Sequence, residues 1–189
     1  MRIKELTKQS RSSLLKELLK RSPEQYEEYE KTVKDILNDV RSNGDEAVIR
    51  YTNRFDKNNI TADTLRVTEE EIEKAYASYD KELIRVMEKA AENIRSYHER
   101  QLQNSWFESS SEGIILGQKI TPLSTVGVYV PGGKAAYPSS TLMCIIPALT
   151  AGVERIIMTT PSDSEGRVSD ATLVAARITG VKEIYKVGG

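Results

Sequence analysis

The stretch 126-VGVYVPGGKAAYPSSTLM-143 combines a strand, a glycine turn and the start of a helix. The apolar run Val126 to Val130 is typical of a buried strand, and Pro131-Gly132-Gly133 predicts a tight turn. Tyr137-Pro138-Ser139-Ser140 predicts the entry to an apolar helix. Such a helix directs free backbone N–H groups and the positive end of its dipole toward whatever lies above the strand. We therefore expect a ligand at this turn, although an ordinary tight connection explains the pattern equally well.

The chain beyond this stretch continues the alternation of strand and helix. A helix is expected from about 138 to 150, followed by the strand RIIMTT, a helix from about 168 to 179, and the strand EIYKV. The order β-α-β-α-β predicts a parallel sheet covered by helices, with ligands at the carboxyl ends of its strands. Because Gly188-Gly189 directly follows a strand, the sheet looks unfinished, and we expect the chain to be a fragment.

The region before residue 125 is predicted to be rich in charged, amphipathic helices. We expect a short helix within residues 1–21, a helix ending at Gly44, and a second one that Asp45 caps and that runs out at residues 53–56. Thr68 and Glu71 are expected to open a further helix as a capping box, and Asp80 is expected to cap a long one. The segments Ile60 to Thr68 and Ile114 to Ile120 read as short strands.

Composition points to a globular protein with no strong electrostatic preference. The 189 residues carry 27 Lys and Arg against 28 Asp and Glu, so we expect no long-range attraction to nucleic acid or to an anionic membrane. The longest apolar stretch, Leu142 to Val153, is too short to span a bilayer and contains Pro147. The single cysteine, Cys144, fits a reducing compartment. We therefore predict a soluble, cytoplasmic protein.

The residues that usually carry chemistry are sparse. One histidine, His98, and one cysteine, Cys144, lie far apart, so neither a metal site nor a catalytic residue is predicted. A hydrogen-bonded structural role is expected for His98, and a buried apolar position for Cys144. Tyr129, at the end of its strand, is either a core residue or a ring that packs on a planar ligand.

Several long segments together resemble the N-terminal part of histidinol dehydrogenases. The likeness rests on VGVYVPGGKAAYPSSTLMCIIPALTAG followed by IIMTTP, with support from VKDILNDVRSNGDEAVIRYTNRFD and ENIRSYHERQ. It covers nearly all of the chain from about residue 30. One departure is the single proline of Pro161-Ser162, where many members have two. Members of the family are much longer than this chain.

The resemblance implies an activity and a set of cofactors. Family members are homodimers that oxidise L-histidinol through the aldehyde to L-histidine, using two NAD molecules in succession and a zinc ion that holds the substrate. Their catalytic base and zinc ligands belong to later segments, so the resemblance assigns no catalytic or metal residue here. It does imply that Tyr129 contacts NAD, and that Pro131, Phe55 and Pro161 line the same site.

The resemblance also implies an aldehyde-dehydrogenase-like fold and a division of the chain. We expect an N-terminal helical arm at 1–21, the N-terminal part of a first α/β domain at 22–124, and the first half of an incomplete Rossmann-like, NAD-binding domain at 125–189. Such a piece is expected to lack histidinol oxidation by itself.

Two alternatives remain. Another aldehyde-dehydrogenase-like oxidoreductase needs a reactive cysteine on a loop beside the nicotinamide, which does not suit Cys144. A non-catalytic binding or dimerisation module is disfavoured because an unfinished parallel sheet exposes apolar surface and an unpaired edge.

Overall fold

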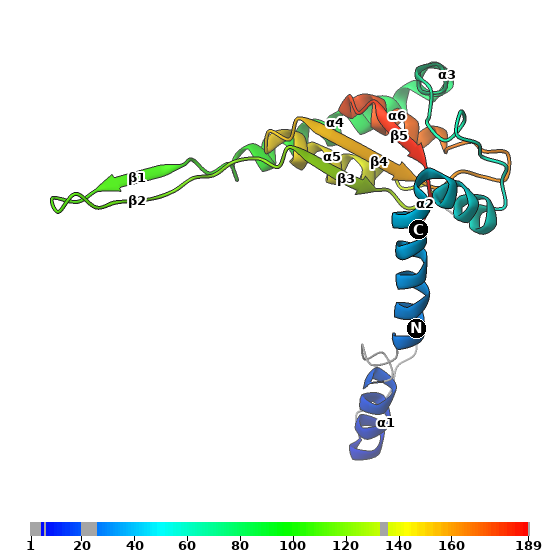
Figure 1. Cartoon of the computed structure of the whole chain (residues 1–189), viewed down its shortest axis with the longest axis horizontal. Helices are drawn as coiled ribbons and strands as arrows, with labels where there is room; N and C mark the ends of the chain where they lie inside the picture. Colours follow the sequence, from blue (N-terminus) through cyan, green and yellow to red (C-terminus); the bar gives the residue numbers. More distant parts are fainter. Residues whose placement is uncertain (1–4, 6, 20–25, 133–135, 189) are drawn as a thin grey trace. The chain divides into compact units, whose positions relative to one another are not determined.

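The computed structural model describes residues 5, 7–19, 26–132 and 136–188 (Figure 1). The chain divides into two compact units, Met1–Ala47 and Val48–Gly189, and each is described by itself. In the described ranges, no helix combines the length and the apolar character that crossing a membrane requires.

The first unit consists of helix α1 (Lys8–Leu19) and the first part of α2 (Glu27–Asp56). The predicted helix within residues 1–21 is therefore confirmed. Thr7 and Ser10 start α1 by reciprocal bonds, because each side-chain oxygen accepts the backbone N–H of the other residue, at 3.1 and 2.8 Å. Gly44, with φ 54° and ψ −135°, has a non-helical backbone at a kink between two helical segments of α2, so the predicted helix end at Gly44 and the second helix after it are confirmed.

The second unit is built on a three-stranded parallel sheet of order β3-β4-β5. Its strands are β3 (Thr125–Tyr129), β4 (Arg155–Thr160) and β5 (Glu183–Lys186). Helices α5 (Pro138–Thr150) and α6 (Asp170–Thr179) connect them, and Pro138 occupies the first turn of α5 as predicted. Tyr129 lies opposite Thr159 in the register of the sheet. The predicted β-α-β-α-β order is confirmed.

Helices cover one face of this sheet. Met158 of β4 is fully buried in one core cluster with Ile145 of α5 and Leu173 of α6. Two further helices, α3 (Glu69–Ser78) and α4 (Lys81–Glu99), form the next layer, in which α3 packs on α6 and α4 packs on α5. Because side chains alternate along a strand, the neighbours of the buried Val128, including Tyr129, face away from α5 and α6.

Local capping signals in the helical region are confirmed. Thr68 and Glu71 form the predicted capping box at the start of α3, and the Asp80 carboxylate accepts the N–H groups of Glu82 and Leu83 at the start of α4. These contacts depend only on neighbours in the chain, so sequence alone can locate them.

The predicted strand from Ile60 to Thr68 is wrong. The Asn53 side chain binds both the N–H and the carbonyl of Ile60, and a turn follows at Thr61 to Thr64. Only the end of the segment meets the sheet, where an antiparallel bridge joins Arg66 to Tyr185. This bridge partly pairs the outer edge of β5.

Two short strands form a separate antiparallel ribbon, β1 (Trp106–Ser109) with β2 (Ile115–Gln118), apart from the three-stranded sheet in Figure 1. The strand expected between Ile114 and Ile120 is confirmed. Its partner β1 was not predicted, because the four residues WFES carry no apolar alternation. Every residue of both strands is exposed.

Candidate functional site

The turn after β3 packs directly on the loop after β4. The N–H of Val130 donates to the carbonyl of Thr159 at 2.8 Å, which extends the pairing of the two strands beyond Tyr129. A Cβ atom added to Gly132 would lie 2.9 Å from Cγ of Pro161. Pro131-Gly132 and Pro161 therefore meet at the carboxyl edge of the sheet, whereas Gly133 falls outside the described residues.

Tyr129 lies at the same edge with its side chain 49% exposed. The neighbouring Val128 and Val130 are buried toward α5, so the tyrosine ring faces away from the helices. The alternative of a core tyrosine is therefore wrong. An accessible aromatic ring with a terminal hydroxyl can stack on a planar group and form a hydrogen bond with it.

Phe55 approaches this edge from the end of α2. Its exposed ring stacks on that of Tyr51, with centroids 5.9 Å apart and planes inclined by 10°. Asp56 follows, and both of its carboxylate oxygens lie 2.9 Å from the place where a Cβ on Gly188 would stand. Since Gly188 lies two residues after the end of β5, Phe55 is near the carboxyl end of that strand.

A buried polar cluster ties the chain after α2 to the chain after β4. Nδ2 of Asn58 donates to Oγ of Ser162 at 2.8 Å, and both residues are buried. Oδ1 of Asn58 and Oδ2 of Asp56 are buried without a hydrogen-bond partner in the described part of the chain. Burial raises the pKa of the Asp56 carboxyl above its ordinary value. The sequence did not predict a role for Asp56 or Asn58. The one sequence feature that could have indicated Asp56 is its position directly after Phe55.

The start of α5 carries no side-chain cap. Tyr137 occupies the N-cap position but makes no side-chain capping bond, and its carbonyl accepts the N–H of Ser140 at 3.0 Å. No acidic residue stands in the first turn. The positive end of the helix dipole is therefore not offset locally, which is the arrangement that favours an anionic ligand group.

His98 and Cys144 take no part in this edge. Nδ1 of His98 lies 2.6 Å from Oε1 of Gln101, and the ring packs edge-on against Tyr97, so the hydrogen-bonded structural role is confirmed. Cys144 is exposed, and the expected buried position is wrong, because α5 turns Leu142 and Ile145 inward instead. Within residues 5, 7–19, 26–132 and 136–188, no three His, Cys, Asp or Glu side chains gather to hold a metal ion.

A parallel sheet with helices on one face, and with proline and glycine turns at its carboxyl edge, defines an α/β protein with a ligand-accessible edge. The chain belongs to the histidinol dehydrogenase family, since a sequence model described as histidinol dehydrogenase matches residues 19–189.

Individual relatives agree with this assignment. The chain is 56% identical to a histidinol dehydrogenase of Bacillus subtilis strain 168 and 49% identical to that of Aquifex aeolicus, over 86% and 100% of this chain. A crystal structure of histidinol dehydrogenase from Elizabethkingia anophelis superposes with a TM-score of 0.79 at 37% identity, over 85% of this chain. The matches span only 38%, 43% and 36% of the relatives' own lengths.

Gly132→Ala is expected to destabilise the second unit by about 1–3 kcal/mol, because the new methyl group would overlap the rigid Pro161 ring and separate the two loops. Urea unfolding followed by circular dichroism measures the loss. Gly127→Ala is the matched control, since a Cβ on Gly127 in β3 meets no atom within 4 Å. Equal losses in the two variants would contradict a specific contact between Gly132 and Pro161.

Proposed function

We propose that this chain is the N-terminal part of a histidinol dehydrogenase, an NAD-dependent oxidoreductase that converts L-histidinol through the aldehyde to L-histidine in histidine biosynthesis. The observation that carries the proposal is the family match over residues 19–189. The activity is that of the full-length relatives, and this chain spans little more than a third of their length.

Within that enzyme, we propose that Tyr129, Pro131, Phe55 and Pro161 hold NAD. Three features of the edge fit such a ligand. The Tyr129 ring is accessible, and Gly132 places no side chain between the two prolines. Oδ2 of Asp56 is a buried acceptor that has no donor among the described residues. The hydroxyl groups of a nucleotide supply donors, and its phosphates suit the uncapped start of α5.

The role of these residues in catalysis would be to bind and orient. NAD supplies the acceptor for the hydride that leaves histidinol. The Tyr129 ring would stack on a planar part of the cofactor, and the contact between Gly132 and Pro161 would hold the two loops at a fixed separation. The described residues do not fit a zinc site, so the zinc ion and the catalytic base are proposed to be held by other parts of the enzyme.

We propose an aldehyde-dehydrogenase-like fold in which 1–21 form a helical arm, 22–124 begin the first α/β domain and 125–189 begin the Rossmann-like NAD-binding domain. The enzyme is proposed to be a cytoplasmic homodimer. The single cysteine supports a reducing compartment, and the parallel sheet with its α/β crossovers supports the Rossmann-like half.

Tyr129→Ala in the full-length enzyme is expected to raise KM for NAD about tenfold and to change KM for histidinol little, since a lost aromatic stacking contact costs about 1.4 kcal/mol. Steady-state kinetics with each substrate varied in turn measures the two constants. Tyr29→Ala, which removes another exposed tyrosine, is the control. Equal rises in both constants would point to a folding role for Tyr129 instead.

The 189-residue chain by itself is expected to bind NAD weakly and to show no histidinol oxidation. Isothermal titration with NAD and a spectrophotometric assay for NADH test these two expectations. Turnover by the purified chain would contradict the proposal that the catalytic base and the zinc ion are held by other parts of the enzyme. Self-association without any NAD binding would favour the alternative of a dimerisation module.

The other alternative, a different aldehyde-dehydrogenase-like oxidoreductase, would make Cys144 the reactive thiol. Since Cys144 is exposed on α5, iodoacetamide can reach it. Alkylation of this residue is expected to leave the activity of the full-length enzyme unchanged, whereas complete inactivation would favour that alternative.

A further inference from the structure

A pocket of about 440 Å³ opens at the start of β5, beside the N-terminal half of α3. Val67, Ile72 and Val181 are buried and form an apolar floor. Gly180 and Lys182 line the side next to the beginning of β5. The pocket therefore lies at the amino edge of the sheet, whereas Gly132 and Pro161 meet at the carboxyl edge.

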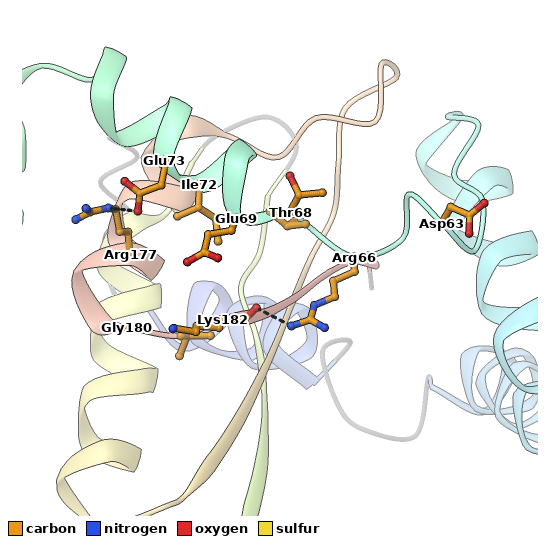
Figure 2. Close-up of a pocket in the computed structure, with 11 residues that line it drawn as sticks. Asp63, Arg66, Thr68, Glu69, Ile72, Glu73, Arg177, Gly180 and Lys182 are labelled. Carbon is orange, nitrogen blue, oxygen red and sulfur yellow. Dashed lines mark hydrogen bonds and ion pairs between the residues drawn. The ribbon is translucent and has the colours of Figure 1, made fainter.

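The rim of this pocket carries charges of both signs (Figure 2). Arg66 reaches toward the start of β5 and donates to the carbonyl oxygen of Lys182 at 3.4 Å, while Glu69 extends from the first turn of α3 on the same side. Asp63 points away from the other rim residues in this view. The rim thus presents a guanidinium, an ammonium and a carboxylate around an apolar floor.

Neighbouring ion pairs leave the Lys182 ammonium and the Glu69 carboxylate available. The Glu183 carboxylate is bound by two nitrogens of Arg155, at 2.7 and 2.8 Å, and the Glu73 carboxylate is bound by Arg177 at 2.7 Å. Neither the Lys182 ammonium nor the Glu69 carboxylate has a hydrogen-bond or ion-pair partner in the described part of the chain. A ligand can therefore bind them without breaking an existing ion pair.

We propose that this pocket binds a free α-amino acid with an apolar side chain. The carboxylate of such a zwitterion would meet Arg66 and Lys182, its ammonium would meet Glu69, and its side chain would cover the floor of Val67, Ile72 and Val181. A ligand without an ammonium group would leave Glu69 unpaired, and a ligand without a carboxylate would leave Arg66 and Lys182 unpaired. Either loss lowers the affinity. The pocket volume lies in the range common for small-molecule sites.

The pocket shares no residue with the proposed NAD site. NAD is expected to shift the amide signals of Tyr129 and Gly132, whereas an amino acid in the pocket is expected to shift those of Val67, Ile72 and Gly180. Titrations of the same sample with the two ligands therefore test the two sites separately, so that one proposal can be wrong while the other holds.

The test is a series of ¹H–¹⁵N NMR titrations of the 189-residue chain with three probes: L-phenylalanine, 3-phenylpropionate, which lacks the ammonium group, and 2-phenylethylamine, which lacks the carboxylate. L-Phenylalanine is expected to shift the pocket amides with a Kd on the order of 1 mM. Each single-charge probe is expected to bind at least about fivefold more weakly, because one charged hydrogen bond is lost.

Two variants identify the charged partners. Arg66→Gln and Glu69→Gln are each expected to weaken L-phenylalanine binding about fivefold or more, while Arg85→Gln on α4, which removes an exposed arginine paired with Glu82, leaves it unchanged. The bridge to β5 is made by the backbone of Leu65 and Val67, so Arg66→Gln should retain the fold. An absence of saturable shifts at the solubility limit of L-phenylalanine would overturn the proposal, as would equal binding of either single-charge probe.

Discussion

Glu71→Ala is expected to lower the free energy of unfolding by about 3 kcal/mol, because it leaves the Lys186 ammonium buried without its partner. The Lys186 side chain, on β5, is only 7% exposed, and its Nζ lies 2.7 Å from Oε1 of Glu71. The same carboxylate holds the start of α3, since Oε2 accepts the backbone N–H of Thr68 at 2.8 Å. One substitution thus removes both an ion pair and one of the two hydrogen bonds of the capping box.

Urea unfolding of the variants measures this effect. Glu82→Ala, which breaks an exposed pair with Arg85, is expected to cost less than about 0.5 kcal/mol. Lys186→Met is expected to lower the free energy of unfolding less than Glu71→Ala does. It removes the buried ammonium itself, so no buried charge is left unpaired, and the bond from Thr68 to Glu71 remains. If Glu71→Ala and Glu82→Ala lose the same stability, the contact between α3 and β5 contributes little.

Ile145→Ala is expected to destabilise the protein by about 2–5 kcal/mol. Ile145 is fully buried where α5 packs on the sheet, in the core cluster that includes Val128 and Met158. Removing its outer carbons leaves a cavity between a helix and a strand, which the parallel sheet cannot close without moving.

The matched control lies two residues earlier on the same helix. Met143 is 62% exposed, so Met143→Ala is expected to change the free energy of unfolding by no more than about 0.5 kcal/mol. Thermal unfolding followed by circular dichroism compares the two variants directly. A larger loss from Met143→Ala than from Ile145→Ala would mean that α5 presents another face to the sheet.

Elements that depend on near neighbours follow from the sequence. Pro138 at the start of α5, the Thr68 and Glu71 capping box and the Asp80 cap all involve residues within one helical turn. The repeated alternation of apolar strand and helix from Val126 to Val187 also predicts the parallel sheet, because strands joined by a helical crossover lie parallel in one sheet.

Elements that depend on distant partners do not follow in this way. The helix α5 is apolar all round in LMCIIPAL, so its periodicity could not show that Ile145 is buried and Cys144 exposed. The bridge between Arg66 and Tyr185 replaces the strand expected from Ile60 to Thr68, because pairing with β5 depends on residues far along the chain.

The candidate site divides along the same line. The turn at Pro131-Gly132 was predicted from the order of strand, glycine and helix, and the family resemblance singled out Tyr129, Phe55 and Pro161. The contact of Gly132 with Pro161, like the proximity of Asp56 to Gly188, emerges only when separate strands end at one edge. Local sequence patterns therefore specify the elements and their order. Long-range packing decides which faces are buried and which residues meet, because those contacts join segments that lie far apart in the sequence.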